Sequence, residues 1–272
     1  MAETENKVVP LFDAAYGNFE TDVQAAVRRG AFGEDIGQNS WLTADEWRRY
    51  LGWLELSPAS ELLDIASGGG GPATCAAREL GCRVVGVEKH ATGVATAQKL
   101  AAQHGLGERV RFLEHDATLP LPFPDASFDA ITCIDSMLHF PDRGAILAEW
   151  RRVLRPGGHI LYTDPIVVTG MVTNEELFIR SSIGFFLFTA VGVNDQLIAT
   201  ADFELVHRED VTEEMARVAR RWLQARSENS EQLVQLEGSS TFEGQQRFFA
   251  VTAKLSAERR LSRFVFHARA RR

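Results

Sequence analysis

Four consecutive glycines, Gly68 to Gly71, restrict the fold more than any other feature of this chain. They follow the run 61–65 (ELLDI), which has the length and composition of a buried strand. Glycine has no Cβ atom, so a turn made of glycines takes positive φ values and lets a ligand approach the backbone. Pro72, a residue that fits the first turn of a helix, begins a helix that we expect to reach Leu80. We therefore predict a strand, a ligand-binding turn and a helix in this order.

Short apolar runs alternate with helical segments over the next 80 or so residues. The expected strands are 83–88, 110–113, 128–134 and 159–163, and the expected helices are 91–104 and 143–154. Together with the first strand, this alternation indicates a parallel sheet that is covered by helices on both faces. Right-handed crossovers place the carboxyl ends of such strands along one edge, where open α/β sheets bind ligands.

The flanking segments differ from this alternating core. Residues 1–56 have an amphipathic helical pattern, and Thr43 followed by Glu46 is a capping box that predicts the start of a second helix. Beyond residue 165 we expect helices at 212–235 and 242–255 and strands at 203–206 and 261–266. The predicted fold class is α/β, a seven-stranded, mostly parallel, doubly wound sheet with a helical lid. We divide the chain into an N-terminal helical lid (1–56), a cofactor-binding core (57–165) and acceptor-side lid helices with strands six and seven (166–272).

Composition disfavours several classes of partner. The formal net charge is -8, whereas a protein that binds nucleic acid needs a basic surface. The six arginines between Arg259 and Arg272 are a local exception, and we interpret them as keeping an exposed terminal strand soluble. The longest apolar stretch, 183–193, is too short to span a membrane. We expect a small-molecule substrate, no nucleic acid, no membrane span, and a monomer or homodimer.

The N-terminus and the cysteines indicate the compartment. The first ten residues, MAETENKVVP, lack a basic flank followed by an apolar run, so we expect no signal peptide and a cytoplasmic protein. Cys75, Cys82 and Cys133 have no CxxC spacing, so we interpret them as buried apolar residues in a reducing compartment. We expect no metal site.

Acidic residues near the ends of the first three strands indicate the ligand. Glu88 lies twenty residues beyond Gly68, where nucleoside-binding folds carry an acid for the ribose hydroxyls. The spacing of the glycines also fits a dinucleotide fingerprint, so the turn alone leaves NAD and S-adenosylmethionine open. Asp64 would repel a pyrophosphate but attract an amine-bearing or cationic ligand, and Asp116 is placed to meet an adenine amino group. These acids favour S-adenosylmethionine.

Five segments resemble the successive motifs of class I S-adenosylmethionine-dependent methyltransferases. They are LLDIASGGGG, VVGVEKH, FLEHDA, FDAITCIDSMLHFPD and LRPGGHILYTD, and they cover about two fifths of the chain. The resemblance implies a small-molecule methyltransferase that uses S-adenosyl-L-methionine and releases S-adenosyl-L-homocysteine. The chain departs from the family at Ala66, where glycine is usual, and this methyl group could shift the methionine end of the cofactor.

The resemblance also implies roles for individual residues. Asp64 and the backbone at the glycine turn would hold the methionine amino and carboxylate groups, and Glu88 would bind both ribose hydroxyls. Lys89 would pack beside the adenine, although a solvated lysine is an equal alternative. Asp116 would read the adenine edge with the Ala117 N–H, unless it only caps the strand end. The expected cofactor contacts are Gln38, Ser40, Asp64, Ala66, Gly68, Gly70, Glu88, Lys89, Asp116, Ala117 and Ile134.

Three features concern the methyl acceptor and the lid. His139 follows the fourth strand, and it is either a general base for a protonated acceptor or a histidine that hydrogen-bonds the lid. Gln38 and Ser40 resemble an N-terminal lid that closes over the cofactor carboxylate, with simple turn residues as the alternative. The phenylalanines between residues 178 and 188 line an apolar pocket or belong to the core.

We therefore expect an enzyme that transfers a methyl group by in-line displacement in a lidded pocket, to oxygen or nitrogen rather than carbon. One alternative is an NAD-dependent oxidoreductase, which would need a Tyr-x-x-x-Lys pair or a similar arrangement that this chain lacks. A second alternative is a non-catalytic cofactor-binding partner subunit, although the retained acids Asp64, Glu88 and Asp116 argue against a decayed site.

Overall fold

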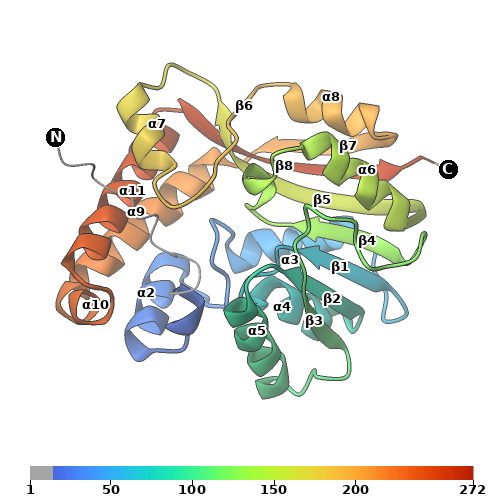
Figure 1. Ribbon diagram of the computed structural model, residues 1–272, viewed down its shortest axis with the longest axis horizontal. Helices are drawn as coiled ribbons and strands as arrows, with labels where there is room; N and C mark the ends of the chain where they lie inside the picture. The colour runs from blue at the N-terminus through green and yellow to red at the C-terminus, as the bar shows by residue number, and fades with distance from the viewer. Residues whose placement is uncertain (1–14, 272) are drawn as a thin grey trace.

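A single twisted sheet forms the centre of the molecule in the computed structural model, which describes residues 15–271 (Figure 1). The strand order is β3-β2-β1-β4-β5-β8-β7. The first five strands are parallel to one another, whereas β8 runs antiparallel to both of its neighbours, β5 and β7. The strands are β1 (Glu61–Ile65), β2 (Arg83–Glu88), β3 (Val110–Glu114), β4 (Phe128–Cys133), β5 (Leu154–Val168), β7 (Phe203–Asp210) and β8 (Leu261–Ala270). The predicted mostly parallel sheet is confirmed, but over residues 15–271 the sheet has eight strands rather than seven, because a two-residue strand, β6 (Thr189–Ala190), pairs with the end of β5.

Helices cover both faces of the sheet, as expected for a doubly wound fold. Alternate residues of a strand point to opposite faces, so Leu62 and Leu63 of β1 belong to different apolar clusters. The cluster around Leu62 includes α3 (Ala44–Trp53), α4 (Gly71–Leu80) and α5 (Ala91–Gln103). The cluster around Leu63 includes α6 (Arg143–Val153) and α8 (Val193–Thr200).

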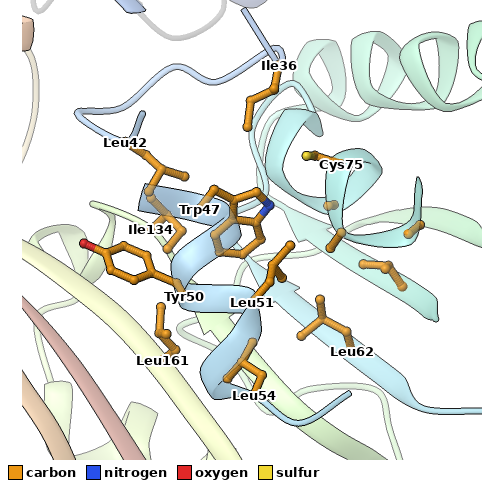
Figure 2. Packing of buried hydrophobic residues seen from close by; sticks show 14 of the residues in the cluster. Ile36, Leu42, Trp47, Tyr50, Leu51, Leu54, Leu62, Cys75, Ile134 and Leu161 are labelled. Carbon is orange, nitrogen blue, oxygen red and sulfur yellow. The ribbon is translucent and has the colours of Figure 1, made fainter. Parts of the chain in front are cut away.

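Helix α3 packs directly against the sheet beside α4 (Figure 2). It begins with the predicted capping box, in which Thr43 and Glu46 each accept a hydrogen bond from the other's backbone N–H. Trp47 is fully buried, and its indole Nε1–H donates to the Pro72 carbonyl over 3.0 Å. Helix α3 therefore fixes the first turn of α4, directly after the glycine turn.

The remaining helices gather beyond one end of the strands, at the left in Figure 1. Helix α9 (Thr212–Glu228) packs against both α2 (Asp22–Phe32) and α11 (Ser239–Ala257). The other two are α7 (Asn174–Arg180) and α10 (Ser230–Glu237). The single helix predicted for 212–235 is wrong, because the chain breaks at Asn229, whose side-chain amide donates to the Ala225 carbonyl and ends α9.

The arginine-rich terminal segment is buried, which corrects our interpretation of an exposed strand. Strand β8 lies between β5 and β7, and Arg263 within it is 0% exposed. Other arginines of this segment form ion pairs with acidic residues that are distant in sequence. Arg259 pairs with Asp210, and Arg260 pairs with Glu176. These arginines therefore connect the C-terminal segment to the surrounding elements through ion pairs.

Other sequence expectations have mixed outcomes. The three cysteines are free and buried, as interpreted. Within residues 15–271 no helix is long and apolar enough to cross a membrane. The ten N-terminal residues behind the signal-peptide prediction lie outside the described part of the chain.

Candidate cofactor and acceptor site

A cavity of about 580 Å³ lies at the carboxyl ends of the central strands, between the sheet and the helices beyond it. One end of its wall is polar and comes from the strand ends and the glycine turn. The other end is aromatic and comes from Trp41, Trp222, Phe248 and Phe249. This is the edge where parallel sheets bind ligands, and the two ends of the wall suit two different chemical groups.

Asp64 stands in the polar wall near the end of β1. One carboxylate oxygen, Oδ1, accepts a hydrogen bond from the Thr132 hydroxyl over 2.7 Å, and the other has no donor among residues 15–271. Burial raises the pKa of Asp64 to about 7, and the nearby Glu88 carboxylate adds to this effect. A buried carboxylate with an open oxygen favours a cationic ligand, because a positive charge would restore its ionised form.

Glu88, at the end of β2, holds the glycine turn in place. Its Oε2 accepts the Gly68 N–H over 2.9 Å, and its Oε1 accepts the His90 N–H over 3.0 Å. Each carboxylate oxygen has more than one lone pair, so both retain capacity for a further donor on the cavity side. Two hydroxyl groups of one ribose would match this arrangement.

The turn after β1 contains a strained residue. Ala66 has φ of 55°, in the left-handed region that costs an alanine about 1–2 kcal/mol. The residue that departs from the family pattern therefore adopts the backbone conformation for which glycine is suited. Gly68 is also left-handed, with φ of 55°, and an added Cβ would lie 3.1 Å from the Tyr16 hydroxyl. Strain of this kind is common at ligand sites.

Lys89 and Asp116 form an ion pair at the mouth of the polar end, with 2.7 Å between Nζ and Oδ2. Burial raises the pKa of Asp116, but hydrogen bonds from Lys89 and Thr118 outweigh it and lower this pKa to about 2. Ala117 lines the cavity beside Asp116. The pair keeps Asp116 ionised at all ordinary pH values, and the Lys89 side chain beside it is 65% exposed.

The turn after β4 separates the polar end from the aromatic end. Ile134 and Asp135 both line the cavity there. Asp135 accepts hydrogen bonds from the Trp41 N–H and from the Thr163 hydroxyl, and it also pairs with Arg263. These contacts fix the polypeptide on both sides of the cavity.

His139 ends a short 3-10 helix, η1 (Met137–His139), and faces the aromatic end of the cavity. Its Nδ1 lies 2.9 Å from the Phe185 carbonyl oxygen, so Nδ1 carries a hydrogen and Nε2 is the basic nitrogen of the neutral ring. Burial lowers the pKa of His139, which favours this neutral form.

Two predicted contacts lie outside the cavity wall. Gln38 is fully buried, where its side chain accepts the Ile36 N–H and donates to the Glu34 carbonyl, so it shapes a turn. Gly70 is needed for packing, because an added Cβ would lie 2.6 Å from both Ala97 and Phe112. Neither residue belongs to the cavity wall, so their predicted cofactor contacts stay predictions. The remaining predicted residues line the cavity: Ser40, Asp64, Ala66, Gly68, Glu88, Lys89, Asp116, Ala117, Ile134 and His139.

Several cavity residues escaped the sequence analysis. Tyr16, Trp41 and Arg180 have no motif around them, and the aromatic residues of α9 and α11 resemble ordinary core positions. Of the phenylalanines between 178 and 188, Phe185 and Phe186 line the cavity, whereas Phe178 does not. The one sequence signal near Trp41 was the resemblance of Gln38 and Ser40 to an N-terminal lid.

Residues 63–162 match a family model described as a methyltransferase domain. The core of this chain is a class I methyltransferase domain. Its matched segment contains the three acids and the glycine turn described above, and S-adenosyl-L-methionine is the cofactor of this family. This match favours a methyltransferase over the alternative of an NAD-dependent oxidoreductase.

Curated relatives share this methyltransferase domain. Methyltransferase GfsG of Streptomyces halstedii is 41% identical over 117 residues, which are 43% of this chain and 41% of that protein. A sterol 24-C-methyltransferase of Gibberella zeae is 32% identical over 165 residues, which are 58% of this chain and 43% of that protein. The match thus spans about two fifths of each relative's length.

The fold resembles that of solved methyltransferase structures. A phosphoethanolamine N-methyltransferase 2 from Haemonchus contortus, solved with S-adenosyl-L-methionine, has a TM-score of 0.79 at 20% identity. The similarity covers 93% of this chain and 58% of that chain. It therefore extends beyond the methyltransferase domain to the helices around the cavity.

Proposed function

We propose that this chain transfers a methyl group from S-adenosyl-L-methionine to a small molecule held at the aromatic end of the cavity. The observation that carries the proposal is the position of Asp64, Glu88 and Asp116. These acids come from the ends of three adjacent parallel strands, and all three line one cavity. The matched methyltransferase domain supports the same activity.

The polar wall fits the parts of this cofactor. The open oxygen of Asp64 suits the methionine ammonium group, and the carboxylate of Glu88 suits the ribose hydroxyls. Lys89, Asp116 and Ala117 would surround the adenine, and Ile134 would lie near the sulfur. When bound, S-adenosyl-L-methionine supplies an electrophilic methyl group on a positively charged sulfur.

We propose oxygen or nitrogen as the acceptor atom because of His139. Its basic Nε2 can remove a proton from a hydroxyl or an ammonium group, which makes either a better nucleophile. The name of the Gibberella zeae relative, a sterol 24-C-methyltransferase, gives carbon as its acceptor atom. The proposal of oxygen or nitrogen therefore rests on His139 and not on the similarity to known proteins.

We further propose that α2, α7, α9, α10 and α11 act together as a lid, hereafter the lid helices. The aromatic residues of α9 and α11 close the cavity on the side away from the sheet. The other three helices add Gln24, Arg180 and Glu237 to its wall. Exclusion of water would strengthen the electrostatic contacts inside and would prevent loss of the methyl group to solvent.

Calorimetry tests the cofactor half of the proposal. We expect heat of binding with S-adenosyl-L-homocysteine and none with NAD. Absence of binding to S-adenosyl-L-homocysteine would contradict the proposed function.

Methyl transfer itself is measured as the release of S-adenosyl-L-homocysteine in the presence of each member of a panel of small alcohols, phenols, amines and alkenes. If a hydroxyl or amine acceptor is methylated, and its turnover is slower in His139→Gln at unchanged cofactor affinity, the role of His139 as the general base is supported. Turnover of an alkene alone would reject oxygen and nitrogen as acceptor atoms.

A further inference from the structure

Arg180 is a buried charge in the wall of the cavity. It is the last residue of α7, its side chain is 1% exposed, and it lies at the aromatic end. Helix α7 is held firmly: it starts with a capping box between Thr173 and Glu176, and Glu176 also pairs with Arg260. The position of Arg180 is therefore set by the fold.

The guanidinium group of Arg180 has no acidic partner. Its Nε is buried without a hydrogen bond, and across residues 15–271 none of its nitrogens donates to a protein acceptor or lies in an ion pair. Every other buried arginine in that range has a carboxylate, and the pairs are Arg28 with Asp35, Arg143 with Asp164, Arg226 with Glu237, and Arg263 with Asp135 and Glu46. Arg180 is the exception.

Aromatic rings surround the guanidinium instead. Its central carbon lies 4.7 Å from the ring centre of Phe248, 5.1 Å from Phe186 and 5.7 Å from Trp41. Such contacts stabilise a cation, but they leave its hydrogen-bond donors unused. The nearest acids that act on it, Asp135 and Asp164, are already neutralised by Arg263 and Arg143.

This charge persists at neutral pH. Burial lowers the pKa of Arg180 to about 9, while the two distant acids raise it only in part. A buried, charged group without a partner is costly to a folded protein, so an external anion is needed to complete the site.

We propose that Arg180 binds a carboxylate on the methyl acceptor, so that the substrate is an apolar or aromatic carboxylic acid. The proposal rests on the proposed function and adds the substrate class. A guanidinium carries five N–H donors in one plane, and two parallel N–H groups on one edge match the two oxygens of a carboxylate. A phosphate dianion would stay half neutralised, because the second arginine of the wall, Arg226, is bound to Glu237.

The aromatic end would hold the body of this acid, and Phe186 connects Arg180 with the base. The His139 ring meets the Phe186 ring edge to face at 5.1 Å, and Arg180 lies over the same ring. A carboxylate on Arg180 therefore places the rest of the acceptor beside His139.

Binding of matched probes to the full chain saturated with S-adenosyl-L-homocysteine tests the proposal. Phenylacetate, hexanoate and benzoate are each compared with their neutral amides and, for the ring, with phenyl phosphate. Calorimetry and quenching of tryptophan fluorescence report binding without any need for turnover. We expect at least one acid to bind about tenfold more tightly than its amide, because only the acid makes charged hydrogen bonds.

Variants assign this preference to Arg180. Arg180→Met should remove the preference for acids, Arg180→Lys should retain part of it, and the surface variant Arg217→Met should leave it unchanged. Equal binding of every acid and its amide, or an undiminished preference in Arg180→Met, would overturn the proposal. If phenyl phosphate binds more tightly than the carboxylic acids, the proposed carboxylate is wrong and the ligand group is a phosphate.

Two further measurements separate the possible failures. Circular dichroism and S-adenosyl-L-homocysteine binding are recorded for each variant, so that a folding defect is recognised. If Arg180→Met does not fold, the preference for acids measured in Arg180→Lys tests the proposal. If the wild-type chain binds S-adenosyl-L-homocysteine but shows no preference for acids, only this inference fails. If it does not bind S-adenosyl-L-homocysteine, the proposed function fails first.

Discussion

Arg263 and Asp135 form an ion pair, with 2.8 Å between Nε and Oδ1, that joins strand β8 to the turn after β4 in the cavity wall. A second nitrogen of Arg263 donates to Glu46 of α3 over 2.8 Å. The side chains of the pair are 0% and 4% exposed, so water does not screen their charges. Asp135 has φ of 52°, and this network is what keeps the strained turn in place.

Arg263→Met should destabilise the fold strongly. The variant leaves the carboxylates of Asp135 and Glu46 buried without their partner, which costs about 3–5 kcal/mol in comparable cases. Urea unfolding followed by circular dichroism measures this loss. The control is Arg217→Met, which removes an ion pair with Glu214 at the surface and should cost about 1 kcal/mol or less. Equal losses in both variants would contradict the network.

Glu88→Ala should weaken binding of S-adenosyl-L-homocysteine by about 1–3 kcal/mol, because two ribose hydroxyls would lose their acceptor. Calorimetry gives the change in dissociation constant. Glu114→Ala is a matched control: Glu114 is paired with Glu88 on the neighbouring strand, yet it is exposed and does not line the cavity. An unchanged dissociation constant for Glu88→Ala would reject the ribose assignment.

Binding of S-adenosyl-L-homocysteine should strengthen as the pH rises from about 6 to about 8. Burial raises the pKa of Asp64 to about 7, so at lower pH this carboxyl must lose its proton before it can bind an ammonium group. Asp64→Asn should remove this pH dependence. Asp116→Asn should leave it in place, since the pKa of Asp116 is about 2 and its charge is constant in this window.

Asp64 also makes a prediction for the unliganded protein. Its folded-state pKa is raised, so the folded chain binds a proton more tightly than the unfolded chain between pH 3.8 and about 7. The contribution of Asp64 to stability is therefore present at low pH and is lost as the pH rises through this window. Unfolding free energies measured at several pH values should show a smaller loss in Asp64→Asn than in wild type.

Ala66→Gly should stabilise the unliganded protein by about 1 kcal/mol, because glycine adopts a left-handed conformation without steric cost. Ala95→Gly is the control of opposite sign. Ala95 is exposed in the interior of helix α5, where a glycine costs about 1 kcal/mol. Thermal unfolding of the two variants should move in opposite directions. A destabilised Ala66→Gly would show that the methyl group makes a contact that outweighs its strain.

The sequence was sufficient to predict the elements whose physical signal is local. Each core strand is a compact apolar run, and the acids at the strand ends stand at fixed spacings from the glycine turn, so Asp64, Glu88 and Asp116 could be placed together. The capping box of Thr43 and Glu46 was likewise visible, because both of its hydrogen bonds form within four residues. Local patterns of this kind do not depend on the rest of the fold.

The acceptor end depends on contacts between distant segments, and the sequence gives no local signal for these. Arg180 and Trp41 are 139 positions apart and share a cavity only through tertiary packing. Gln38 had the composition of a contact residue, but its side chain closes its own turn instead. The terminal arginines looked like a solvated tail because the acids that pair with them lie far away in sequence.

The insertion of β8 between β5 and β7 has a consequence for how this protein is made. Strand β8 follows both of its neighbours in the chain, so β5 and β7 leave the ribosome with a gap between them. Until residues 261–270 emerge, the edge of β5 stays open and Asp135 lacks its ion pair with Arg263. The turn after β4 therefore gains its full set of contacts only when β8 enters the sheet.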